Sequence, residues 1–173
     1  LPTNGPSINE VKKYIEKYLE EIIVIKCGGS VLLDENLFKQ FIEDISVIYK
    51  LGLSVIVVHG GGKNIKKKLD EQNISTKFID GLRVTDEKTI KVVEDALLEL
   101  NSEIIEKLIN YGCKVQAITV KKNNIIEVLP EQKDLGFVGS PKKIKKEILL
   151  EIIKKKEVPV IIPMGVGENK KPY

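Results

Sequence analysis

The sequence predicts an α/β fold, a three-layer sandwich built on an open, mainly parallel central sheet. Apolar, β-branched runs alternate with amphipathic stretches, which is the pattern of βαβ units. The apolar runs are continuous rather than alternating, as is typical of parallel strands buried on both faces. Two of these runs end in adjacent glycines just before a predicted helix, and open α/β sheets bind ligands at that edge.

The first third of the chain is expected to supply a leading helix, two strands and a helix between them. Residues 8–20 carry apolar side chains at helical spacing. Residues 22–26 and 54–58 are predicted strands buried on both faces. Asp34 is expected to cap the intervening helix. The predicted apolar stripe of that helix is Leu37, Phe38, Phe41, Ile45 and Ile48.

The middle third is expected to be mainly helical. Residues 63–72 read as a lysine-rich helix, and residues 78–89 as a connection with a turn at Asp80-Gly81. A long helix is predicted from about 86 to 110, with an apolar stripe from Ile90 to Leu108, and Gly112 marks its end.

The last third is expected to contain further strands and one helix. Residues 114–120 and 124–129 are predicted strands, joined by a hairpin or a short loop. Residues 134–141 are predicted to be a glycine-punctuated loop, followed by a helix over 142–156. A strand over 158–167 is then expected to enter a Gly-rich turn. No internal repeat or linker divides the chain.

Composition excludes several classes of partner. With 42% hydrophobic and 31% charged residues, the chain is expected to be a soluble domain, with no run near the ~20 apolar residues of a membrane span. Lysines are interleaved with apolar residues and aromatic content is 5%, so no nucleic-acid partner is expected. Two cysteines are too few for a disulfide framework and the first residues lack a secretory pattern, which together favour a cytoplasmic location.

The glycine-rich strand ends are candidate anion sites. In "IKCGGS" and "VVHGGG" the adjacent glycines leave backbone N–H groups unobstructed, and a following helix N-terminus adds partial positive charge. Lys26 adds a full charge that could bridge the oxygens of a transferring phosphate. Neither stretch is a Walker A loop or a G-x-G-x-x-G motif.

Arg83 is the one arginine among 28 basic residues. A guanidinium grips a carboxylate or phosphate with two parallel hydrogen bonds, which lysine cannot do, so Arg83 is a candidate anion ligand. His59 is the one histidine, so no histidine pair is available to hold a metal, and a structural role is expected for it. Cys27 is interpreted as a packing residue.

The chain resembles the N-acetylglutamate kinases, which are part of the amino acid kinase family. The stretches that carry the resemblance run from about residue 8 to the end, and "GLRVTD" is the most specific. They occur in the family's order and approximate spacing: "IVIKCGGS", "VIVVHGGGKNI", "GLRVTDEKTIKVVE", "DLGFVG" and "PVIIPMGVGE".

The resemblance implies ATP-dependent phosphorylation of the γ-carboxylate of N-acetyl-L-glutamate, a step in arginine biosynthesis. ATP with Mg would be the co-substrate, with no protein-bound metal. Lys26 matches the catalytic lysine that stabilises the transition state, and Gly28 and Gly29 match the glycines that face the nucleotide phosphates. Gly61 and Gly62 match the backbone donors to the acceptor, and Arg83 matches the arginine that grips a substrate carboxylate.

The resemblance also implies how the chain is organised. The helix at 8–20 resembles one that assembles hexamers, so a homo-oligomer is expected, a dimer or a hexamer. Residues 21–173 would form the acceptor-binding lobe. The family's C-terminal nucleotide-binding lobe would then be absent, leaving the fold incomplete at the C-terminus and this chain by itself inactive.

The sequence departs from the family's pattern at one loop and at Cys27, where Tyr or Leu is more usual, and it leaves two alternatives open. After residues 114–120 the chain has "TVKKNN", where many members have a Ser-Gly-Lys-Asp turn. One alternative is a non-catalytic module that binds N-acetylglutamate or regulates a partner. The other is a kinase for a related acylated amino-dicarboxylate.

Overall fold

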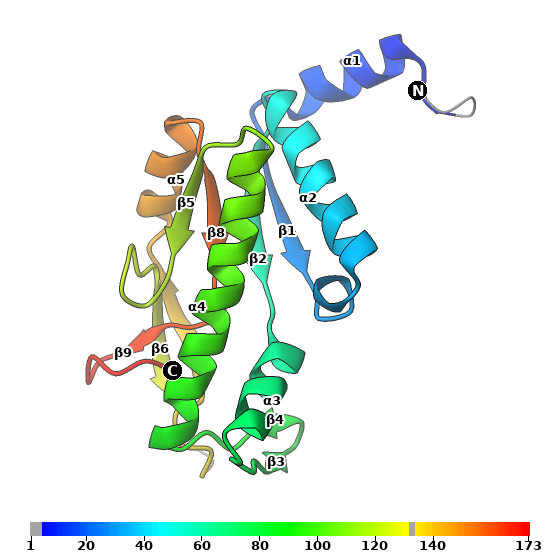
Figure 1. The fold of residues 1–173 in the computed structure, drawn as a ribbon. Helices are drawn as coiled ribbons and strands as arrows, with labels where there is room; N and C mark the ends of the chain where they lie inside the picture. Colours follow the sequence, from blue (N-terminus) through cyan, green and yellow to red (C-terminus); the bar gives the residue numbers. More distant parts are fainter. Residues whose placement is uncertain (1–4, 132–133) are drawn as a thin grey trace.

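A computed structural model describes residues 5–131 and 134–173, and it has the predicted three-layer α/β arrangement (Figure 1). The helices are α1 (Ile8–Tyr18), α2 (Glu35–Lys50), α3 (Gly62–Glu71), α4 (Glu87–Asn110) and α5 (Lys146–Lys154), with a short 3-10 turn η1 (Val31–Leu33). The strands are β1 (Ile22–Cys27), β2 (Ser54–His59), β3 (Phe78–Ile79), β4 (Leu82–Arg83), β5 (Val115–Ile118), β6 (Ile126–Pro130), β7 (Gly139–Ile144), β8 (Val158–Ile161) and β9 (Val166–Gly167).

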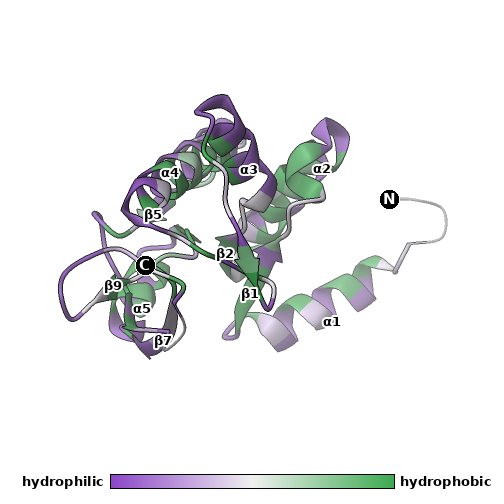
Figure 2. Cartoon of the chain, turned by 90° about the horizontal axis from the view of Figure 1, so that it is seen from below, coloured by the Kyte–Doolittle hydropathy of each residue, from purple (hydrophilic) through white to green (hydrophobic). Residues whose placement is uncertain are grey.

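The central sheet is parallel and has the strand order β1-β2-β8-β5. Helices α2 and α4 cover one face and α5 lies on the other, as Figure 2 shows from below. Successive side chains of β2 divide between the two faces, with Val55 and Val57 toward α2 and α4, and Ile56 and Val58 toward α5. The predicted fold class is therefore confirmed.

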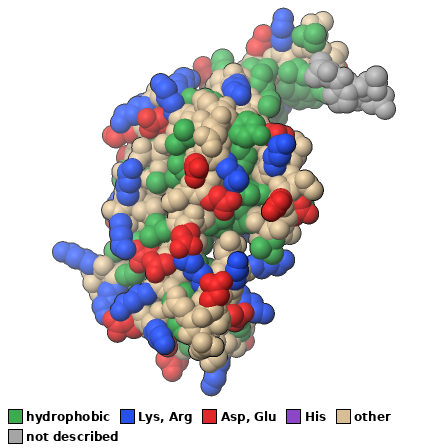
Figure 3. All heavy atoms as spheres, viewed as in Figure 1, with side chains coloured by type: hydrophobic (Ala, Val, Ile, Leu, Met, Phe, Trp, Pro, Cys, Tyr) green, Lys and Arg blue, Asp and Glu red, His purple; other side chains and the backbone are tan. Residues whose placement is uncertain are grey.

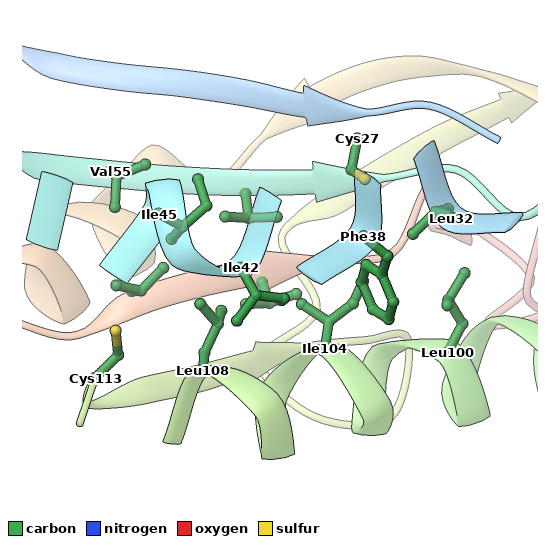
Figure 4. Close-up of a cluster of buried hydrophobic side chains, with 13 residues drawn as sticks. Cys27, Leu32, Phe38, Ile42, Ile45, Val55, Leu100, Ile104, Leu108 and Cys113 are labelled. Atoms are coloured by element: carbon green, nitrogen blue, oxygen red, sulfur yellow. The ribbon is translucent and has the colours of Figure 1, made fainter. Parts of the chain in front are cut away.

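The core between the sheet and helices α2 and α4 is made mainly of closely packed aliphatic side chains, together with Phe38 and two cysteines (Figure 4). Ile42 on α2 and Ile104 on α4 are each at most 1% exposed, and Cys27 of β1 lies among them. Asp34 caps α2, as predicted, by accepting hydrogen bonds from the N–H groups of Asn36 and Leu37 at 2.9 and 3.0 Å. The cap at Asp34 fixes the start of α2, and the buried apolar side chains fix how α2 and α4 lie against the sheet.

Strand β1 is half exposed, so the prediction that it is buried on both faces was wrong. It lies at the edge of the sheet, where α5 does not cover it, and Val24 is 63% exposed. Leu37, which was predicted to lie in the apolar stripe of α2, is also exposed, at 51%. Local periodicity could not reveal either exposure, because it depends on which elements pack alongside.

The segment after β5 departs most from the prediction. Of the two predicted connections after β5, the hairpin is wrong, because β6 joins a separate sheet of order β7-β6-β9, and a short loop joins β5 to β6. Strand β7 replaces the expected end of the loop and start of the helix, so α5 begins only at Lys146. The lysines that suggested a helix face instead pair with acids: Lys145 contacts Glu127 at 3.2 Å and Lys142 contacts Glu168 at 2.7 Å. Part of the expected 134–141 loop thus belongs to β7.

Helix α1 stands clear of the rest of the chain (Figures 1 and 2). A capping box between Ser7 and Glu10 starts it, yet none of its residues is buried. Its apolar side chains are at the surface, and Figure 3 shows hydrophobic atoms where α1 leaves the body. None of the helices in the described residues has the length and apolar character that a membrane span needs.

Candidate functional site

The carboxyl ends of β1 and β2 lie side by side and form the centre of the candidate site. Cys27 and His59 are register partners, and the N–H of Gly60 donates a hydrogen bond to the carbonyl of Cys27 at 2.9 Å. This bond joins the two glycine-rich stretches directly. The structure thus places Lys26, Gly28 and Gly29 beside Gly61 and Gly62 at one edge of the sheet, where parallel sheets bind ligands.

Gly28, Gly29 and Gly62 border open space. A Cβ built at any of the three would meet no atom of the described residues within 4 Å, and none of them has a positive φ. The described fold therefore does not itself require glycine at these positions. A glycine in such a place lets a ligand approach the backbone closely.

Lys26 is exposed and lies on the face of the sheet opposite to Cys27. Its register partner is Val58, which points to the α5 face, and directly paired residues of parallel strands point the same way. The amine of Lys26 therefore extends from the α5 face of the sheet, one residue before the backbone turn that begins at Gly28.

Gly61 is closely packed, in contrast to its neighbours. A Cβ at this position would lie 2.6 Å from Cδ2 of Leu97, a side chain of α4 that is only 2% exposed. Gly61 is also the N-cap of α3, and its carbonyl accepts the hydrogen bond from Ile65 at 2.8 Å. Within residues 5–131 and 134–173, the N–H groups of Gly61 and Gly62 have no recorded acceptor, so both can donate to an anion.

His59 is buried and belongs to a small polar network. Its Nδ1 lies 2.9 Å from the carbonyl oxygen of Gly60, and its Nε2 lies 3.1 Å from Nδ2 of Asn101 on α4. Asn101 also donates to the carbonyl of Val160 at 3.2 Å, which links the network to β8. Burial lowers the pKa of His59, so the imidazole is neutral near pH 7.

Arg83 lies further along α3, in a pocket of about 560 Å³ between that helix and the β3–β4 hairpin. Its guanidinium donates to Oγ1 of Thr76 at 2.7 Å and stacks over the ring of Phe78 at 4.8 Å. Burial lowers the pKa of Arg83, and the charge of Asp70 opposes that shift. Lys66, one helical turn from Gly62, also lines the pocket. The residues that line the pocket do not include the glycines, and Arg83 lies beside the second half of α3.

The sequence profile that describes the amino acid kinase family matches residues 21–172. The chain belongs to the amino acid kinase family. The match includes both glycine-rich strand ends and the β3–β4 hairpin, so the candidate site lies wholly within the region that defines membership.

Several named relatives are similar to this family member along nearly its whole length. The acetylglutamate kinase of Pelagibacter ubique (strain HTCC1062) is 58% identical over 173 residues, which is 100% of this chain and 60% of the relative. The acetylglutamate kinase of Petrotoga mobilis (strain DSM 10674 / SJ95) is 39% identical over 167 residues, covering 95% of this chain and 56% of that protein. The chain thus spans a little over half the length of these relatives.

Solved structures share the family's fold. The protein smu.665 of Streptococcus mutans UA159 has a TM-score of 0.79 at 29% identity, covering 87% of this chain and 62% of the other. A carbamate kinase of Giardia lamblia bound to AMP-PNP has a TM-score of 0.60 at 15% identity, covering 88% of this chain and 60% of the other. The second likeness concerns the fold alone.

Two other strand ends at this edge of the amino acid kinase fold have mainly structural contacts. After β8, a Cβ at Gly165 would lie 2.6 Å from Cγ1 of Val128, so this glycine serves packing rather than an open loop. After β5, Lys121 forms an ion pair at 2.9 Å with Glu94, a largely buried carboxylate of α4. That pair fixes the "TVKKNN" loop to α4 and raises the pKa of Lys121.

Sequence reasoning selected the glycines and the charged groups as candidates but did not select several side chains that contact them. Thr76 and Phe78, which hold Arg83, gave no signal in advance. Asn101 did give one, because it is a polar residue within the apolar stripe of α4, and buried polar groups require partners. Cys27 is a buried free thiol whose pKa burial raises to about 11, which agrees with a packing role. The described residues contain no cluster of three or more His, Cys, Asp or Glu placed to hold a metal ion.

Proposed function

We propose that this chain is the acceptor-binding part of an acetylglutamate kinase. The complete enzyme would transfer the γ-phosphoryl group of ATP to the γ-carboxylate of N-acetyl-L-glutamate, as a step in arginine biosynthesis. The observation that carries the proposal is the 58% identity, along all 173 residues, to a relative named acetylglutamate kinase. Because the chain spans 60% of that relative, transfer itself is assigned to a protein of the relatives' length.

Phosphoryl transfer to a carboxylate requires positioning and charge neutralisation. An oxygen of the acceptor carboxylate attacks the γ-phosphorus, the bond to the bridging oxygen breaks, and ADP leaves with that oxygen. We assign the N–H groups of Gly61 and Gly62 to the acceptor carboxylate, because both have no acceptor among the described residues. ATP would bring Mg²⁺ with it, bound to its phosphates.

Lys26, Gly28 and Gly29 are assigned to the phosphates. The open space at Gly28 and Gly29 admits phosphate oxygens close to the backbone, and Lys26 extends from the adjacent strand end. The amine of Lys26 would neutralise charge that develops on the transferring group, which is its proposed catalytic contribution.

Arg83 is assigned to a second carboxylate of the acceptor. Its stacking on Phe78 and its bond to Thr76 hold the guanidinium in the pocket. A planar guanidinium can form two parallel hydrogen bonds with a carboxylate, and lysine cannot reproduce that geometry. Both glycine donors and Arg83 would then hold a dicarboxylate at its two ends.

We also propose that α1 mediates self-association and that the protein acts in the cytoplasm. Helix α1 and its C-cap residue Leu19 leave an apolar face available to another copy, with Ile8, Tyr14 and Leu19 exposed to the extent of 64%, 58% and 49%. The cytoplasmic assignment is supported by two free cysteines, because reducing compartments keep thiols unpaired.

Titration calorimetry of the folded chain tests the proposal. N-acetyl-L-glutamate is expected to bind, whereas L-glutamate, which keeps both carboxylates but lacks the acetyl group, is expected to bind at least about tenfold more weakly. N-acetyl-L-2-aminoadipate, one methylene longer, distinguishes a related acylated amino-dicarboxylate as the acceptor. A folded chain that binds none of the three would overturn the assignment. Binding without turnover in a protein of the relatives' full length would favour the non-catalytic module.

A further inference from the structure

We infer that His59 and Asn101 are positioning residues that set the direction of the Gly61 N–H. They hold the peptide between Gly60 and Gly61 so that this N–H faces the side of the sheet from which Lys26 extends. The inference rests on the proposed function, because it gives that N–H an acceptor carboxylate to bind. Neither side chain touches the reacting atoms in this arrangement.

The contacts of His59 determine its tautomer. A carbonyl oxygen can only accept, so the 2.9 Å contact with Gly60 places the proton on Nδ1. Nε2 then carries a lone pair and accepts from Nδ2 of Asn101 at 3.1 Å. The amide of Asn101 is itself oriented by donating to the carbonyl of Val160. Asn101 thus keeps His59 in the tautomer that can hold Gly60.

Because the peptide group is planar, holding the carbonyl of Gly60 also sets the direction of the Gly61 N–H. In a trans peptide the C=O and the N–H point in opposite directions, and the described chain has no cis peptide. The carbonyl of Gly60 points to the buried imidazole, so the N–H of Gly61 points away from it. His59 follows Val57 by two residues and lies on the same face, toward α4. The Gly61 N–H therefore faces the opposite side.

Lys26 extends from that opposite side. Its register partner Val58 faces α5, as described above. The full positive charge and the backbone donor therefore converge on one side of the strand ends. A phosphoryl group passing between a nucleotide and an acceptor needs both there, the donor on the acceptor carboxylate and the amine on the transferring oxygens.

The run of three glycines, residues 60–62, explains why the carbonyl of Gly60 needs a hydrogen-bond partner to fix its orientation. Glycine adopts positive and negative φ values with similar ease, so the peptide between Gly60 and Gly61 has little intrinsic preference for one orientation. Anchoring its carbonyl to a buried ring removes that freedom. His59 is 1% exposed and Asn101 is 2% exposed, so water does not compete for these bonds.

The first test measures the orientation without ligand. Residual dipolar couplings of the 15N-labelled chain report the direction of the Gly61 N–H, and ring 15N shifts report the tautomer of His59. His59→Asn keeps a donor near the position of Nδ1, and His59→Gln keeps a polar group only near Nε2. We expect the Gly61 coupling to be preserved in His59→Asn and changed in His59→Gln and Asn101→Ala.

Ser46→Ala is the matched control, because Ser46 is a buried polar side chain that donates to the carbonyl of Glu43 far from the glycines. It should leave the Gly61 coupling unchanged. In a His59→Asn background, Asn101→Ala should have no further effect on the coupling, because asparagine has no tautomer to fix. A proton on Nε2 in the unmodified chain, or an unchanged coupling in folded His59→Gln, would overturn the inference.

The second test measures affinity for N-acetyl-L-glutamate. His59→Gln and Asn101→Ala are expected to weaken binding about tenfold, the effect of misdirecting one hydrogen bond to a charged group, and His59→Asn by less than about threefold. Changed couplings with unchanged affinity would overturn the positioning role. If the unmodified chain does not bind the compound, the proposed function fails, whereas the couplings still decide whether His59 orients Gly61.

Discussion

The two strand ends that carry adjacent glycines look alike in sequence, yet the fold holds them very differently. At the end of β2, Gly61 packs against Leu97 and the preceding residue, Gly60, is bound by His59, although Gly62 borders open space. At the end of β1, Gly28 and Gly29 border open space, and Lys26 is exposed on an edge strand. One end is preorganised by the core of this chain, and the other is not.

This difference fits a division of labour in the proposed reaction. The β2 end, which we assign to the acceptor, is packed and hydrogen-bonded without any ligand, so little conformational freedom would be lost on binding. The phosphate side has room for a large polyanion. Substitutions at the β2 end should therefore alter stability and acceptor affinity, whereas substitutions at the β1 end should alter turnover alone.

The largest expected effect is that of Lys26→Ala on turnover. Removing one group that stabilises transition-state charge lowers turnover by about 10²–10³-fold, measured in a protein of the relatives' full length. Affinity of the present chain for N-acetyl-L-glutamate and its melting temperature should both stay unchanged, since Lys26 is exposed. Lys39→Ala, on the surface of α2, is the control. A loss of acceptor affinity equal to the loss of turnover would make Lys26 a binding residue only.

Gly61→Ala and Gly28→Ala should separate the two strand ends by stability. The new methyl group at Gly61 would lie 2.6 Å from the buried Leu97, which is expected to destabilise the fold by about 1–3 kcal/mol. At Gly28 it meets no described atom, so the free energy of unfolding should stay within about 0.5 kcal/mol or rise. Urea unfolding measures both. Equal losses would contradict the distinction between a packed and an open end.

Arg83→Lys tests whether the acceptor side extends to the hairpin. Losing the planar fork should weaken binding of N-acetyl-L-glutamate by about tenfold although the charge is kept. Calorimetry measures this change, and Lys66→Arg, the reverse exchange in the same pocket, provides the control for a change of side-chain shape that keeps the charge. Similar affinities of the unmodified chain and Arg83→Lys would remove Arg83 from the site.

The smallest expected effect is a dependence of stability on pH through His59. Burial lowers the folded-state pKa of His59 below its unfolded value, about 6.5. The unfolded chain therefore binds the proton more readily, and the stabilisation is fully present above that pH and is lost as the pH falls below it. The slope is at most about 1.4 kcal/mol per pH unit.

Urea unfolding between pH 7.5 and pH 5 measures this slope. Because His59 is the one histidine of the sequence, His59→Asn should flatten the curve in this interval. An unchanged slope in the variant would show that the ring does not stay neutral in the core, and it would weaken the contrast between the two strand ends.

Features that depend on residues close in the chain could be predicted from the sequence, whereas features that depend on distant elements could not. The helix cap at Asp34 and the turn at Asp80-Gly81 were predictable, because both depend on residues close in the chain. The exposed face of β1 and the partner of β6 were not, because they depend on which distant elements pack alongside. The candidate site shows the same limit: Lys26 and Arg83 were selected as candidates by type and position, while Thr76 and Phe78, which contact Arg83, were not.

The sequence by itself determined the order of strands and helices, the glycines at the strand ends and the family to which the chain belongs. Hydrophobic periodicity, turn chemistry and short motifs determine those properties, and each of these features involves only a few residues. Only the tertiary structure decided that Asn101 reaches His59 across 42 positions of sequence. It likewise decided that one glycine end is fixed and the other open, because packing and buried hydrogen bonds join residues that the chain keeps far apart.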